Sequence, residues 1–168
     1  MGNAKLHPMV QEFHTKSRGA KNLILLDRDG TLNYDSGYTY KVKDLIILPH
    51  NVELIKGLLD KKSSIACITN QSGIGRGYFS AEEAKIFNRA LHKKLCELGL
   101  LIDIFYICPH IPELNCPCRK PGTLMLEMAL RLSKIPIEKS VFVGDSITDE
   151  IACRKLGIKY IQVVSNSI

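Results

Sequence analysis

Residues 23–32 read Leu-Ile-Leu-Leu-Asp-Arg-Asp-Gly-Thr-Leu, an apolar run that leads directly into two aspartates and a glycine. A short apolar run of this kind predicts a buried strand of a parallel sheet, and Gly30 permits a sharp turn after it. In open α/β sheets, ligands bind beyond the carboxyl ends of the strands. Asp27 and Asp29 repel each other there unless a cation or a substrate compensates their charge. The stretch therefore predicts a metal-assisted nucleophilic site at the end of the first core strand.

Apolar strands and amphipathic helices alternate along the rest of the chain. Further strands are predicted at residues 65–68, 102–107, 141–143 and 160–164, and helices at 52–59, 80–98, 123–132 and 148–156. Asn51 is a candidate cap of the first helix, and Ser80 with Glu83 forms a capping box at the second. The glycines within residues 73–77 predict a flexible loop. The alternation predicts an α/β fold whose parallel sheet of about five strands carries helices on both faces.

Length and composition indicate one globular domain, with 168 residues, of which 45% are hydrophobic and 24% charged. Residues 1–21 are polar and lack periodicity, so we expect a flexible N-terminal extension followed by a single domain over residues 22–168. No apolar stretch approaches the roughly 20 residues of a membrane span, and the chain starts without a signal-peptide core. We therefore expect a cytoplasmic monomer with no membrane partner.

A formal net charge of +6 favours an anionic partner. The sequence has no tryptophan and no stripe of Lys and Arg interleaved with aromatic residues, so nucleic acid is not the expected partner. A small phosphorylated substrate fits the same positive balance.

Three of the six cysteines gather in one proline-rich loop, residues 108–118, together with a histidine. Cys108, His110, Cys116 and Cys118 offer three thiolates and one imidazole, which is a recognised tetrahedral zinc set. All four positions would be filled by protein, so the expected Zn²⁺ is structural. The remaining cysteines lie in apolar or helical patterns and are interpreted as small core residues. This distribution suits a reducing compartment.

Every predicted strand end carries polar residues: Asp27 and Asp29 at the first, Thr69 and Asn70 at the second, the cysteine loop at the third and Asp145 at the fourth. One or two carboxylates with substrate phosphate oxygens and waters form the coordination that Mg²⁺ prefers. A carboxylate nucleophile that forms an aspartyl-phosphate is an established route of phosphoryl transfer. The pattern predicts a magnesium-dependent phosphoryl-transfer site.

In this order the motifs resemble those of the haloacid dehalogenase (HAD) superfamily of phosphatases. Residues 27–31 (Asp-Arg-Asp-Gly-Thr) resemble its first motif, Thr69 the second, Lys120 the third, and Gly144-Asp145 with Asp149 the fourth. The resemblance implies a Rossmann-like three-layer α/β sandwich without a large cap domain. Ser146 stands where many relatives carry a lysine.

The same resemblance implies roles for the motif residues. Asp27 would be the nucleophile, and Asp29 the proton donor and acceptor. Mg²⁺ would be held by Asp27, Asp145 and the backbone carbonyl of Asp29. Thr69 and Lys120 would stabilise the phosphoryl oxygens, where fixed donors act on developing charge.

The zinc loop resembles that of the HAD branch which acts on histidinol phosphate and on heptose bisphosphates. Its five residues between His110 and Cys116 are similar to the histidinol-phosphate members, whereas residues 69–79 and 35–38 resemble the heptose members. The resemblance favours removal of the 7-phosphate of D-glycero-D-manno-heptose 1,7-bisphosphate, a step towards nucleotide-activated heptose. The expected substrate contacts are Asp35, Ser36, Gly37, Tyr38, Asn70, Gln71, Ser72, Arg76 and Arg119, with the two arginines clamping the second phosphate.

Three alternatives stay open at this point. A histidinol-phosphate phosphatase would act on a cationic monophosphate, a 3′-phosphatase would act on nucleic-acid ends, and a zinc module without enzymatic activity would bind a partner.

Overall fold

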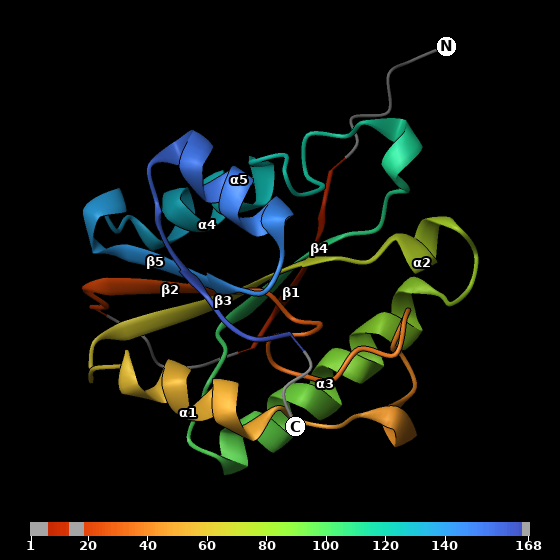
Figure 1. The fold of residues 1–168 in the computed structure, drawn as a ribbon, viewed down its shortest axis with the longest axis horizontal. Helices are drawn as coiled ribbons and strands as arrows, with labels where there is room; N and C mark the ends of the chain where they lie inside the picture. The colour runs from red at the N-terminus through yellow and green to blue at the C-terminus, as the bar shows by residue number, and fades with distance from the viewer. Residues whose placement is uncertain (1–6, 14–18, 166–168) are drawn as a thin grey trace.

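A six-stranded sheet runs through the middle of the part of the chain that the computed structural model describes, residues 7–13 and 19–165 (Figure 1). In spatial order β1-β4-β3-β2-β5-β6, its strands are β1 (Met9–Glu12), β4 (Ile104–Cys108), β3 (Ser63–Asn70), β2 (Asn22–Leu26), β5 (Ser140–Gly144) and β6 (Lys159–Gln162). The helices are η1 (Val42–Asp44), α1 (Pro49–Gly57), α2 (Ser72–Gly75), α3 (Ala81–Glu97), η2 (Pro112–Leu114), α4 (Leu124–Ser133), η3 (Ile137–Lys139) and α5 (Ile147–Leu156). None of these helices is long and apolar enough to cross a membrane.

The apolar run of β2 serves both faces of the sheet because successive side chains of a strand point in opposite directions. Leu23 and Leu25 pack in the cluster that includes residues of α4 and α5. Ile24 and Leu26 pack in the cluster that includes residues of α1 and α3. Figure 1 shows α1 and α3 on one side of the sheet and α4 and α5 on the other. The predicted three-layer α/β sandwich is confirmed.

The sheet order places one set of strand ends together. Five strands, β2 to β6, pair in parallel, and β2 lies between β3 and β5. The chain first builds outward from β2 through β3 to β4, and later returns to the other side of β2 with β5 and β6. A reversal of this kind leaves a crevice at the carboxyl ends of the strands beside β2. The carboxyl ends of β2, β3, β4 and β5 carry the polar residues that the sequence predicts to form the site.

The N-terminal segment contains a sixth strand, so the prediction of a flexible extension is wrong for part of it. β1 pairs antiparallel with β4, from Met9 opposite Ile107 to Glu12 opposite Ile104. Phe13 follows and stacks on His92 with ring centroids 4.0 Å apart. Residues 1–6 and 14–18, also assigned to the extension, lie outside the described residues. The sequence of β1, Met-Val-Gln-Glu, is neither a continuous apolar run nor a strict apolar-polar alternation, so its pattern does not indicate a strand.

Two local expectations also need correction. Asn51 does not cap α1, which begins with Pro49 after Leu48; its buried side chain donates to the backbone carbonyl of Thr31 at 3.1 Å. The glycine-rich segment is not a plain loop, because residues 72–75 form α2. A Cβ on Gly75 would lie 2.7 Å from the carbonyl oxygen of Pro109. Glycine at position 75 therefore allows the two segments to pack closely. The capping box predicted for Ser80 and Glu83 is confirmed at the start of α3.

Candidate active site

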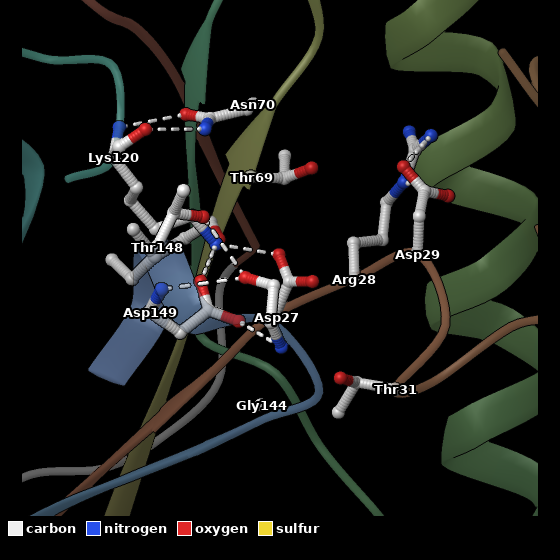
Figure 2. Close-up of polar contacts among 12 residues, drawn as sticks. Asp27, Arg28, Asp29, Thr31, Thr69, Asn70, Lys120, Gly144, Thr148 and Asp149 are labelled. Carbon is white, nitrogen blue, oxygen red and sulfur yellow. Dashed lines mark hydrogen bonds and ion pairs between the residues drawn. The ribbon is translucent and has the colours of Figure 1, made fainter. Parts of the chain in front are cut away.

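Lys120 forms the centre of a buried charge cluster at the carboxyl ends of β2 and β5 (Figure 2). Its Nζ lies 2.6 Å from Oδ1 of Asp27 and 2.7 Å from Oδ1 of Asp149, and it donates to the carbonyl oxygen of Ile68 at 2.8 Å. A buried ammonium is tolerated only when it is paired and hydrogen-bonded in this way. Two hydrogen bonds, to Asp27 and to the carbonyl of Ile68, and an ion pair with Asp149 hold the ammonium beside Asp27.

Asn70, at the end of β3, fixes the backbone from which Lys120 projects. Its Nδ2 donates to the carbonyl oxygen of Lys120 at 3.1 Å, and its Oδ1 accepts from the backbone N–H of Lys120 at 3.0 Å. Two opposed hydrogen bonds define both the position and the direction of the peptide. Asn70 was predicted to contact substrate, but its amide is directed to Lys120 (Figure 2).

Three carboxylates share the cluster, since Asp27, Asp145 and Asp149 each bring an oxygen within 4.8 Å of the others. Asp149 is already engaged, with Oδ1 on Lys120 and Oδ2 accepting from the backbone N–H of Ser146 at 3.3 Å. Asp27 and Asp145 therefore remain as the pair best placed to hold a cation. Two hard carboxylate oxygens are ligands of the kind that Mg²⁺ prefers. Ser146, which stands where the HAD resemblance implies a lysine, caps α5 in a capping box with Asp149.

Burial and mutual charge perturb the cluster. Burial raises the pKa of Asp27 well above that of an ordinary aspartate, and Lys120 opposes this rise. Burial lowers the pKa of Lys120, but Asp149 and Asp27 outweigh it and hold that pKa above the usual lysine value. Lys120 is thus a cation. A second cation beside Asp27 would favour the ionised, nucleophilic form of Asp27.

The turn after β2 brings its loop against the end of β5. Gly30 has φ of 77°, in the left-handed region. A Cβ at this position would lie 2.2 Å from Oδ2 of Asp145. Both facts require glycine, because any other residue would be strained and would displace the carboxylate. Thr31, the next residue, donates weakly to Oδ1 of Asp145 at 3.4 Å.

Asp29 lies apart from the lysine cluster, near α3 (Figure 2). Gln71 connects it to Thr69 at the end of β3: Nε2 of Gln71 donates to Oδ2 of Asp29 at 2.6 Å and to Oγ1 of Thr69 at 2.9 Å. Gln71 was predicted to contact substrate, and the structure places its amide nitrogen between two candidate catalytic residues. Ser72, also a predicted contact, is buried at the first turn of α2.

The predicted substrate loop, residues 35–38, lies beside α2. Asp35 organises the loop, because its Oδ1 accepts from the backbone N–H of Gly37 and from Oγ1 of Thr39, both at 3.0 Å. The exposed ring of Tyr38 meets Tyr78 edge to face, with centroids 4.9 Å apart. Ser36 is exposed in the same loop. Ser36, Tyr38 and Tyr78 thus form a solvent-exposed surface, called the rim below.

Arg76 links α2 to the cysteine loop. Its Nη2 lies 3.5 Å from Oε1 of Glu113 in η2. The pKa of Glu113 is lowered by a backbone hydrogen bond and by the positive charges of Arg76 and Arg119. Both arginines therefore act on the same carboxylate. Nη1 of Arg119 is buried without a hydrogen-bond partner, which is a costly state for a guanidinium. The two predicted anion-binding arginines thus converge on one region, and one of them has an unused donor.

The four predicted zinc ligands lie together. The three Sγ atoms of Cys108, Cys116 and Cys118 are 3.3–3.5 Å apart, and Nδ1 of His110 is 3.1 Å from Sγ of Cys118 and 3.5 Å from Sγ of Cys108. The edges of a tetrahedron around zinc measure about 3.5–3.8 Å. A hydrogen bond from Cys118 is the main cause that lowers the pKa of Cys108 to about 5, and the same hydrogen bond raises the pKa of Cys118, so without a metal one of these two thiols keeps its proton. The donor set and its spacing fit zinc.

Comparison with known proteins identifies the family. A protein of Thermoplasma acidophilum, named a probable D-glycero-D-manno-heptose-1,7-bisphosphate 7-phosphatase, is 37% identical over 94% of this chain and 98% of its own length. The chain belongs to the heptose-bisphosphate phosphatase family. The D-glycero-beta-D-manno-heptose-1,7-bisphosphate 7-phosphatase of Haemophilus ducreyi is 37% identical over 83% of this chain and 80% of that protein. Residues 117–167 also match a family model described as HAD-hydrolase-like.

A solved member of the heptose-bisphosphate phosphatase family has the same fold. The D,D-heptose 1,7-bisphosphate phosphatase of B. bronchiseptica, crystallised with magnesium and phosphate, superposes with a TM-score of 0.79 at 32% identity. The match covers 87% of this chain and 83% of that one. As a member of this family the chain is a HAD-like phosphoric monoester hydrolase, and the HAD resemblance drawn from its motifs is confirmed.

One buried residue was not predicted to contribute to the site. Arg28, between the two aspartates, is fully buried and pairs with Asp29, with Nη2 and Oδ2 2.8 Å apart. A signal for its direction was present in the sequence. Arg28 lies two residues after Leu26 and four after Ile24, whose side chains face α1 and α3. In an extended chain, residues two and four positions apart line the same face, so the side chain of Arg28 is expected on that face.

Proposed function

We propose that this enzyme removes the 7-phosphate of D-glycero-D-manno-heptose 1,7-bisphosphate through an aspartyl-phosphate on Asp27. The observation that carries the proposal is the buried contact of Lys120 with Asp27, at the strand ends where Asp145 also lies. The names of relatives at 37% identity support the substrate. Inorganic phosphate and heptose 1-phosphate are the products, on the way to nucleotide-activated heptose for surface polysaccharide.

Two displacements at phosphorus account for the reaction. In the first, a carboxylate oxygen of Asp27 forms a bond to phosphorus while the bond from phosphorus to the sugar oxygen breaks, and Asp29 gives that oxygen a proton. In the second, Asp29 takes a proton from water as the water oxygen attacks phosphorus, which releases phosphate and restores Asp27. Lys120 and Thr69 donate to the phosphoryl oxygens in both steps, where fixed donors stabilise the developing charge.

Asp27 and Asp145, with the backbone carbonyl of Asp29, would hold Mg²⁺. The ion supplies positive charge that neutralises the phosphoryl oxygens and keeps Asp27 ionised. The excess of carboxylates over Lys120 in the cluster supports this site, as does the magnesium in the B. bronchiseptica structure.

The second phosphate is proposed to bind Arg76 and Arg119, at the rim that also carries Tyr38. Arg76→Ala is expected to lower kcat/KM for the heptose bisphosphate by about 10- to 100-fold, since a charge-assisted hydrogen bond is lost. Histidinol phosphate lacks the second phosphate, so its kcat/KM should change by less than about threefold. Arg154→Ala is the matched control, because Arg154 is also an exposed arginine paired with a glutamate, Glu150.

The decisive comparison is kcat/KM of the purified enzyme for both anomers of the heptose bisphosphate, for histidinol phosphate and for a 3′-phosphorylated oligonucleotide. The proposal expects a preference for one heptose anomer. A preference for histidinol phosphate together with an unaffected Arg76→Ala variant would refute it. Tight, steeply salt-dependent binding of the oligonucleotide would favour a nucleic-acid 3′-phosphatase instead.

Residues 108–118 are proposed to bind one structural Zn²⁺ that holds Arg119 and Lys120 in place before substrate arrives. We expect about one zinc per chain by elemental analysis of the purified protein. Cys118→Ser should lose the zinc, lower the melting temperature and reduce kcat/KM by about 10- to 100-fold. Cys96→Ser, in α3, is the control. A Cys118→Ser variant that melts and turns over like the wild type would refute the zinc assignment.

One phosphatase domain over residues 22–168, to which β1 adds a strand, is part of the proposal. Cytoplasmic location, a monomeric state and the lack of membrane and nucleic-acid partners stay predictions.

A further inference from the structure

Arg28 is a fully buried arginine whose side chain lies beside Asp29 near α3 (Figure 2). Burying a guanidinium is costly unless partners satisfy its donors. Its Nε lies 3.0 Å from Oδ1 of Asp29, and its Nη2 lies 2.8 Å from Oδ2 of the same carboxylate. A bidentate contact from the planar guanidinium fixes the direction of a carboxylate as well as its position.

Neighbouring elements hold Arg28 itself. Nη1 donates to Oδ1 of Asn88 in α3 at 3.0 Å, and Nη2 donates to the carbonyl oxygen of Thr39 at 3.0 Å. The guanidinium carbon lies 4.7 Å from the centre of the Phe87 ring, within the range of a cation–π contact. The fork that orients Asp29 is therefore anchored to α3 and to the loop that follows residues 35–38.

The contacts continue outward to the edge of the sheet. Nδ2 of Asn88 donates to Oε1 of Gln11 at 3.2 Å, and Nε2 of Gln11 donates to the carbonyl oxygen of Lys85 at 3.1 Å. Gln11 lies in β1. An unbroken series of side-chain contacts thus leads from the N-terminal strand through Asn88 and Arg28 to Asp29.

Asp29 accepts from two further donors. Nδ2 of Asn33 reaches its Oδ1 at 3.0 Å, and Nε2 of Gln71 reaches its Oδ2 at 2.6 Å. With the two contacts from Arg28 these fill the roughly four acceptor sites of an ionised carboxylate. To carry a proton, Asp29 must give up one contact. Gln71 is the partner that loses least, because its Nε2 also reaches Thr69.

We propose that Arg28 is a positioning residue that orients the Asp29 carboxylate for proton transfer to the leaving sugar oxygen, and that Asn88 and Gln11 hold Arg28 in that role. The inference rests on the proposed function, in which Asp29 transfers this proton. Misplacement of a reacting group by about 1 Å can cost on the order of 100-fold in rate. Arg28 variants should therefore impair the step that needs the proton and spare a step that does not.

Two substrates separate these cases. The sugar phosphate needs a proton on its leaving oxygen, whereas the leaving group of p-nitrophenyl phosphate departs as a stable anion. The quantity to compare is kcat/KM, which covers the steps up to departure of the leaving group. Arg28→Met should lower kcat/KM about 100-fold for the heptose bisphosphate and less than about tenfold for p-nitrophenyl phosphate.

Graded variants follow the series of contacts. Arg28→Lys keeps the charge without the fork and should recover part of the loss. Asn88→Ala and Gln11→Leu should lower kcat/KM by progressively smaller factors. In each variant the loss should again be larger for the sugar phosphate than for p-nitrophenyl phosphate. Arg89→Met is the control, since Arg89 lies next to Asn88 in α3 but is exposed and paired with Glu82.

Equal losses on both substrates would overturn the inference and leave Arg28 a structural residue only. If Arg28→Met does not fold, Arg28→Lys and Asn88→Ala decide by the same ratio, with melting temperatures measured in parallel. A wild-type enzyme that hydrolyses p-nitrophenyl phosphate and histidinol phosphate but no heptose bisphosphate would refute the proposed substrate. The ratio is then measured with histidinol phosphate, and equal losses again overturn the inference.

Discussion

Asp27→Asn is expected to abolish phosphatase turnover, with kcat falling on the order of 10⁴-fold or more, the scale of loss when a covalent nucleophile is removed. Asparagine keeps the shape of the side chain but has no oxygen able to form the aspartyl-phosphate. Lys120 keeps its contact with Asp149, at 2.7 Å, so we expect the fold to persist. Phosphate release measures the activity, and intact-mass analysis after rapid acid quench should find phosphorylated protein only in the wild type.

Asp44→Asn is the control for this experiment, because Asp44 is exposed in η1. Turnover by Asp27→Asn at more than about a hundredth of the wild-type rate would contradict the nucleophile assignment. Undiminished turnover by Asp27→Asn would support the alternative of a zinc module without enzymatic activity, in which the phosphatase activity of the preparation comes from another protein.

Lys120→Met is expected to have the second-largest effect, on both activity and stability. kcat/KM should fall by about 10²–10³-fold, because a fixed cation that stabilises the phosphoryl oxygens is removed. The free energy of unfolding should fall by about 3–5 kcal/mol, because Asp27 and Asp149 lose their buried partner. Steady-state kinetics and urea unfolding measure the two effects on the same preparations.

A second substitution separates these roles. Adding Asp149→Asn to Lys120→Met removes one unpaired buried carboxylate, so it should restore part of the stability and none of the activity. Lys93→Met, on the exposed surface of α3, is the control. Wild-type kcat/KM in Lys120→Met would contradict the role assigned to this lysine.

The strands and helices that build the core were largely predictable because their apolar residues recur with the period of each element. The edge strand β1 was not, since its sequence Met-Val-Gln-Glu has neither the apolar run nor the alternation that indicates a strand. Asn51 was misread as a cap because the same residue type also serves as a buried donor, here to the carbonyl of Thr31. Sequence shows that a polar group is present but not which partner it takes.

The candidate site divides in the same way. Asp27, Thr69 and Asp145 were predictable because each ends a recognisable strand, and parallel strands bring their carboxyl ends to one edge. The direction of Asn70 towards Lys120 was not predictable. These two residues are 50 positions apart, and only the folded chain brings the lysine backbone within hydrogen-bond distance of Asn70.

The sequence by itself determined the chemistry available to this protein: the kinds of residues at each strand end, the set of three cysteines and one histidine, and the sheet that gathers them. The tertiary structure alone decided the pairings, such as Lys120 with Asp27 across 93 residues and Arg28 with Asn88 across 60. The physical reason is range. Apolar periodicity is a local property of the chain, whereas a buried charge takes whichever partner the packed elements bring within hydrogen-bond distance.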